Sequence, residues 1–183
     1  MSKSFLRYIP KSLIVIVVPI FVLVSNPYKA LSAEKVVLRY GNHSMPVTVN
    51  ELVVFAQTGQ QSSALRTYFR MSEQNPGLLR NALNKNFPVN GVSLSRTLNS
   101  PLAFLILNPL TNVITTPTQR GSRESLRGAL VKSALDNENQ LNLIQVIKNY
   151  PTNEVHIRGD RMVETYNNMQ GMMEAMPFFS PPQ

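Results

Sequence analysis

Serine chemistry has one candidate in this chain. A serine hydrolase holds its nucleophile at a sharp turn between a strand and a helix, which is why glycines flank the serine as Gly-x-Ser-x-Gly. The nearest match is the run 91–95 (GVSLS), which lacks the second glycine and follows no clear strand. We therefore interpret Ser93 as the N-terminal cap of a short helix that carries Leu94 and Leu98, and predict no catalytic residue.

The sequence also offers few residues for histidine catalysis or metal binding. The chain contains two histidines, His43 and His156, and no cysteine. Neither histidine belongs to an HExxH motif, a histidine pair or a carboxylate cluster, which are the usual patterns of a metal site. We predict that both are surface residues and that the protein binds no metal and no cofactor.

Three arginines lie close together in the sequence, at Arg120, Arg123 and Arg127. Around the start of a helix they could converge on a carboxylate or a phosphate. Arginines four residues apart are also common on a solvated helix face, and we favour that interpretation.

The last stretch of the chain is rich in methionine. Met162, Tyr166, Met169, Met173 and Met176 follow one another at alternating spacings of four and three, the pattern of a helix that lies against another helix. Methionine adapts to irregular surfaces, so these five residues could bind a protein partner. The alternative is that this C-terminal amphipathic helix packs on its own domain, as most amphipathic helices do.

Residues 1–33 read as a secretory signal peptide. Lys3, Arg7 and Lys11 precede the apolar run 13–24, and the small residues of 30–33 (ALSA) suit cleavage after Ala33 or after Ser32. Twelve helical residues span only about 18 Å, less than the ~30 Å hydrocarbon core of a bilayer. We therefore predict an extracytoplasmic protein, in the periplasm, in the thylakoid lumen or secreted, that meets the membrane only through the uncleaved signal.

The amino-acid composition limits the number of domains and the classes of function. The 183 residues are 43% hydrophobic and 15% charged, which suits one compact domain. Four of the 18 basic residues lie in the signal, so a net charge of about +4 remains, spread without a Lys/Arg run. Nucleic-acid binding needs clustered cations, and we exclude it.

Residues 34–158 are expected to form one helical domain with an N-terminal β-hairpin. Alternating apolar residues on both sides of the turn at 41–44 predict the hairpin, with Pro46 on an edge strand. Thr48 and Glu51 match a capping box for a helix that ends at Gly59.

Further helices are predicted along the domain. The clearest starts at 121–122, while Asn108-Pro109 should break or kink the helix before it and 110–119 should be a loop. A short extended segment at 155–157 precedes the last helix and a proline tail at 159–183. The predicted fold class is mainly α, a bundle of short helices with a small N-terminal β-hairpin.

Several stretches resemble a cyanobacterial family, the domain of unknown function 1400, which is labelled alpha/beta hydrolase. The most specific are 33–41 (AEKVVLRYG) and 47–59 (VTVNELVVFAQTG), followed in order by 92–102, 125–130 and 144–151. The resemblance implies a helical region that, in the family, often stands before a separate catalytic domain. No catalytic residue of that domain has a matching position here.

Two functions follow from these observations. The first is an exported, non-catalytic helical domain that binds a protein partner or an envelope component. The alternative is an extracytoplasmic hydrolase of esters or peptides, as the family label implies. Phe178 and Phe179 suggest, more weakly, a structural role at a membrane surface.

Overall fold

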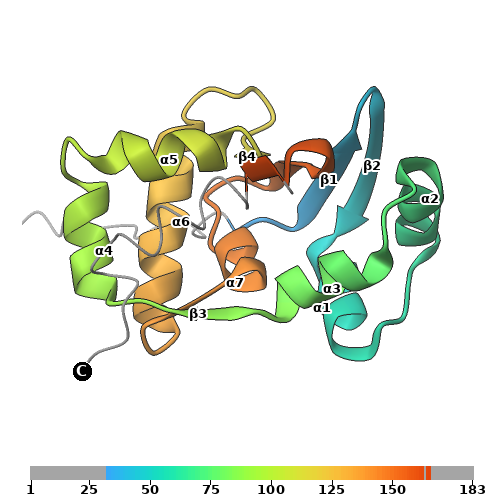
Figure 1. Cartoon of the computed structure of the whole chain (residues 1–183), viewed down its shortest axis with the longest axis horizontal. Helices are drawn as coiled ribbons and strands as arrows, with labels where there is room; N and C mark the ends of the chain where they lie inside the picture. The colour runs from blue at the N-terminus through green and yellow to red at the C-terminus, as the bar shows by residue number, and fades with distance from the viewer. Residues whose placement is uncertain (1–31, 163, 166–183) are drawn as a thin grey trace, which may run out of the picture.

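The computed structural model describes residues 32–162, 164 and 165 (Figure 1). Most of the predicted signal peptide and of the methionine-rich segment therefore lies outside the described residues. The helices are α1 (Val49–Thr58), α2 (Ser63–Ser72), α3 (Pro76–Asn84), α4 (Gly91–Leu98), α5 (Ala103–Thr111), α6 (Ser122–Asp136) and α7 (Leu143–Lys148). The strands are β1 (Lys35–Tyr40), β2 (His43–Thr48), β3 (Asn86–Pro88), β4 (Ile114–Thr115), β5 (Gln140–Asn142) and β6 (Glu154–Arg158). Residues 159–162, 164 and 165 are also helical.

The predicted fold class, a mainly α bundle, is wrong. The described residues are 55% helix and 19% strand, and they include a mixed four-stranded sheet in the order β2-β1-β6-β4 and a two-stranded sheet of β3 and β5. β6 pairs parallel to β1, and β4 pairs antiparallel to β6. The hairpin is thus half of a larger sheet, because β6 returns from the far end of the domain to lie beside β1.

The predicted hairpin itself is confirmed. β1 and β2 are antiparallel around Gly41 and Asn42, and Gly41 adopts a positive φ of 55° that suits glycine. Pro46 lies on β2, which is the end strand of the described sheet, where a missing amide donor breaks no ladder.

The capping box of α1 is also confirmed. The Glu51 amide donates to the Thr48 hydroxyl at 3.1 Å, and the Thr48 amide donates to the Glu51 carboxylate at 2.7 Å. At the other end, Gly59 takes a left-handed conformation with φ 76°. Arg80 and Asn84 of α3 then donate to the Ala56 carbonyl, so α3 stabilises the C-terminus of α1.

Two local predictions are wrong, and a third is corrected in part. Asn90, not Ser93, is the cap of α4, because the Asn90 side chain accepts from the Ser93 amide at 2.9 Å. Of the break or kink predicted at Asn108-Pro109, the break does not occur, because Pro109 lies in the last turn of α5, where only one intrahelical bond is lost. The predicted loop 110–119 contains β4, which is two residues long and has no periodicity to reveal it.

α6 is the helix around which several other elements of the domain pack. It contacts α4, α5 and α7 as well as β4 and β5, and Figure 1 shows it grouped with α4 and α5 at the end of the domain away from the hairpin. Its predicted apolar face is confirmed, since Leu126, Ala129, Leu130 and Ala134 are buried. The fully buried Tyr150 donates to the carbonyl of Ser122, which ties the start of α6 to the chain after α7.

Candidate functional site

The two histidines lie on the four-stranded sheet, apart from Ser93. His43 is exposed at the start of β2, as predicted. The His156 side chain on β6 is only 17% exposed, so it is more buried than predicted. Its Nε2 lies 2.7 Å from Glu154 Oε1, and Glu154 Oε2 lies 3.5 Å from Lys35 Nζ. These three side chains form an ion-pair cluster on the sheet.

Of the buried serines in the described residues, Ser122 and Ser133 are hydrogen-bonded within the fold, whereas the Ser72 hydroxyl has no partner there. Ser93 lies half-buried within α4, and the buried Ser133 hydroxyl accepts from the Asn149 side chain at 3.0 Å. Ser122 and Thr116 bond to each other in the loop before α6. Within residues 32–165 as described, no group of three or more acidic or histidine residues could hold a metal ion.

The cluster around Glu154 makes stability depend on pH. The hydrogen bond from His156 is the main cause that lowers the pKa of Glu154 below its ordinary value of 4.5, and Lys35 adds to it. A carboxyl with a lowered folded-state pKa stabilises the fold above its unfolded-state pKa, and this contribution is lost as pH falls through the folded-state value.

We therefore expect Glu154→Gln to weaken the acid sensitivity of the domain. Between pH 7 and pH 3 the free energy of unfolding, measured with urea, should fall less in this variant than in the wild type. Glu34→Gln is the control, because Glu34 is exposed and directly precedes β1, the strand of Lys35 that pairs with β6. An unchanged pH dependence in Glu154→Gln would contradict the role of this ion pair.

The three arginines do not form one anion site. Arg123 Nη2 donates to Asn108 Oδ1 of α5 at 2.8 Å, and Arg120 is exposed before α6 begins. Only Arg127 lines the groove described next.

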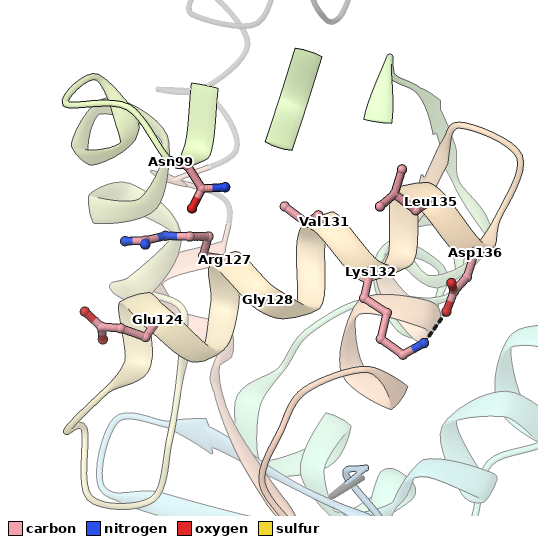
Figure 2. A pocket seen from close by; sticks show the side chains of 8 residues that line it. All are labelled: Asn99, Glu124, Arg127, Gly128, Val131, Lys132, Leu135 and Asp136. Carbon is pink, nitrogen blue, oxygen red and sulfur yellow. Dashed lines mark hydrogen bonds and ion pairs between the residues drawn. The ribbon is translucent and has the colours of Figure 1, made fainter. Parts of the chain in front are cut away.

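An open groove of about 430 Å³ runs along the outer face of α6 (Figure 2). All but one of its lining residues come from α6, at the spacings of one helix face, and Asn99 follows α4. The lining residues are Asn99, Glu124, Arg127, Gly128, Val131, Lys132, Leu135 and Asp136. We call this surface the α6 groove.

The α6 groove combines apolar and charged groups. Val131 is half-buried and Leu135 is 55% exposed, while Lys132 and Asp136 form an ion pair with each other. Figure 2 shows Arg127 and Asn99 at one end and Leu135 toward the other. The surface therefore carries the apolar side chains of Val131 and Leu135 between charged residues of both signs, with Arg127 and Glu124 together at one end.

Two groove residues are unusual for a plain solvated helix. Arg127 Nε is buried and has no hydrogen-bond partner among the described residues, an arrangement that typically costs about 1–3 kcal/mol. Gly128 lies within α6, where glycine costs about 1 kcal/mol relative to alanine, although a Cβ there would meet no atom within 4 Å. This surface was not predicted from the sequence. The signal available was a glycine in an otherwise well-formed amphipathic helix.

The methionine-rich seam is described only at its start. Met162 is partly buried and packs against the core. Tyr166, Met169, Met173 and Met176 lie outside the described residues, so their role in binding stays a prediction.

Known proteins give one match. The model of a family described as alpha/beta hydrolase of unknown function, domain of unknown function 1400, matches residues 32–158. No curated protein and no solved structure matches the chain at a significant level. Among the described residues, every helix is too short or too polar to cross a bilayer.

Proposed function

The chain belongs to the family described as alpha/beta hydrolase of unknown function, and we propose that it is an exported protein that binds a protein partner or an envelope component without catalysing a reaction. The observation that carries this proposal is the α6 groove, which holds the exposed Leu135 toward one end and, at the other, an Arg127 whose Nε has no acceptor in the described part of the chain. The methionine-rich stretch from Met162 to Met176 is the second surface that we propose to contact this partner.

The chemistry of the α6 groove suits a protein ligand. Binding surfaces between proteins combine apolar side chains with arginine, and fully desolvated arginines are frequent hot spots. The helices beside the groove also expose apolar side chains, which a soluble surface usually limits. These residues are Val92, Leu102, Phe104 and Leu105.

Capture from an envelope extract tests the groove as a binding surface. We expect Leu135→Asp in the mature chain to reduce recovery of the specific partner by about tenfold or more, because burying a leucine is worth about 1.5–3 kcal/mol. Leu78→Asp is the matched control, since Leu78 of α3 is 59% exposed and lies outside the groove. Equal capture by both variants would contradict the proposal.

Export is the second part of the proposal, and the start of the domain supports a particular cleavage site. Ala33 is only 4% exposed and belongs to the core, and the amides of Glu34 and Lys35 donate to the Asn153 carbonyl. Ser32 is exposed, so water can replace the bond from its hydroxyl to Lys148. Cleavage after Ser32 keeps the buried Ala33 and places Ala30 and Ser32 at the small-residue positions of the signal.

We therefore expect the protein in its own cells to begin at Ala33. Intact-mass measurement and N-terminal sequencing of the purified protein check this. A mature chain that begins at Glu34 would contradict the role of Ala33 in the core, and an uncleaved chain recovered from the cytoplasm would contradict export.

The alternative function is an extracytoplasmic hydrolase of esters or peptides, favoured by the family's description. Its serine would be Ser93, although that residue lies within α4 and its amide is bound by Asn90. We expect a fluorophosphonate probe to leave the mature chain unlabelled. Labelling of the wild type that Ser93→Ala abolishes would establish the hydrolase and overturn the non-catalytic proposal.

A further inference from the structure

We propose that the start of α5 docks on the surface of an anionic lipid bilayer through the exposed side chains of Leu102, Phe104 and Leu105. We call these three residues the α5 surface, and none of them lines the α6 groove. This inference deepens the proposed function, on which it rests, because it names the envelope component that the exported protein binds. It replaces the expectation from the sequence that the protein meets the membrane only through its uncleaved signal.

The α5 surface is an exposed apolar patch. Residues 101–107 (PLAFLIL) are apolar without interruption. The core takes three of them, whereas Leu102, Phe104 and Leu105 stay 58%, 48% and 38% exposed. Large apolar side chains that stand together on a protein surface typically mark a site of interaction with another protein or with a membrane.

The stretch of chain around the α5 surface carries only positive charge. Residues 86–123 contain no acidic residue, and their basic residues are Arg96, Arg120 and Arg123, all exposed. The next acidic residue, Glu124, lines the α6 groove. Apolar side chains accompanied by cations complement a bilayer surface, where hydrocarbon lies beneath anionic headgroups.

Arg123 is held close to the α5 surface. Its Nη2 donates to Asn108 Oδ1 at 2.8 Å, and Asn108 lies four residues after Phe104 in the same helix. Residues four apart share a helix face, so the Arg123 guanidinium lies on the face that carries Phe104. A guanidinium has five donors, and one bond to an amide leaves this exposed side chain able to hold a phosphate.

The chemistry of the α5 surface favours a bilayer over a protein as its ligand. A protein interface carries about one hydrogen bond per 100–200 Å², and residues 101–107 have no polar side chain to contribute one. A bilayer requires no directional match of this kind. Its acyl boundary accepts apolar side chains, and its headgroups accept the neighbouring arginines.

Vesicle flotation tests the apolar part of this docking. The probe is vesicles of an equimolar mixture of phosphatidylcholine and phosphatidylglycerol. We expect Leu102→Ser with Phe104→Ser to lower the partition of the mature chain onto them by about tenfold or more, because both side chains lose their burial at the acyl boundary. Met71→Ser with Leu78→Ser is the matched control, since these residues of α2 and α3 are 40% and 59% exposed. Equal partition of the two variants would overturn the proposal.

Charge reversal tests the arginines at exposed positions, where the fold depends little on the side chain. Arg120→Glu with Arg123→Glu should lower partition onto the same vesicles by tenfold or more, because each basic residue near an anionic surface strengthens binding about fivefold. Arg66→Glu with Arg70→Glu is the control, since both arginines are exposed on α2 and the net charge changes equally. Equal losses in the two variants would show that net charge alone attracts the chain and would overturn the docking of α5.

The wild type supplies the remaining outcomes. We expect it to float with the mixed vesicles and to bind vesicles of phosphatidylcholine alone more weakly. No flotation with the mixed vesicles would overturn the proposal. Should Leu102→Ser with Phe104→Ser then lower protein capture from an envelope extract, the α5 surface would belong to a protein partner. The vesicles contain no protein, so failure of this assay is distinct from failure of capture through Leu135 of the α6 groove.

Discussion

The parallel pairing of β1 with β6 is the constraint on which the rest of the domain depends. It aligns Val36 with Val155 and Leu38 with Ile157, and all four side chains are at most 4% exposed. Parallel strands need a long crossover, and here the crossover contains every labelled helix. Closing so long a loop costs chain entropy, which burial of the apolar face of the sheet offsets.

The position of α6 follows from that crossover, and the α6 groove follows from the position of α6. The helix turns Leu126, Ala129, Leu130 and Ala134 toward the core and contacts neighbours on several sides. Residues three and four apart share a helix face, so Arg127, Val131 and Leu135 must lie along another one. The same periodicity that builds the core therefore leaves an apolar strip outside it.

Local signals in the sequence predicted local structure well. The capping box at Thr48, the turn at Gly41 and the apolar face of α6 each depend on residues a few positions apart. The strands β3, β4 and β5 have two or three residues, too few for a period, and β6 finds its partner far along the chain. Near the start of α4, both Asn90 and Ser93 have side chains that can cap a helix, and in the structure Asn90 is the N-cap. The groove depends on the packing of α4 beside α6, which no local pattern encodes.

Several polar side chains of the described residues hold the fold together through hydrogen bonds. Ser122, Ser133 and His156 are each hydrogen-bonded to a neighbour within the fold. In the described residues, buried side-chain atoms without a hydrogen-bond partner occur at Ser72 and Arg127. Of these two residues, only Arg127 lines the groove. A guanidinium stays charged and cannot act as a base or nucleophile near neutral pH, but it can hold a carboxylate through directional hydrogen bonds. The guanidinium of Arg127 is therefore suited to recognising an anion.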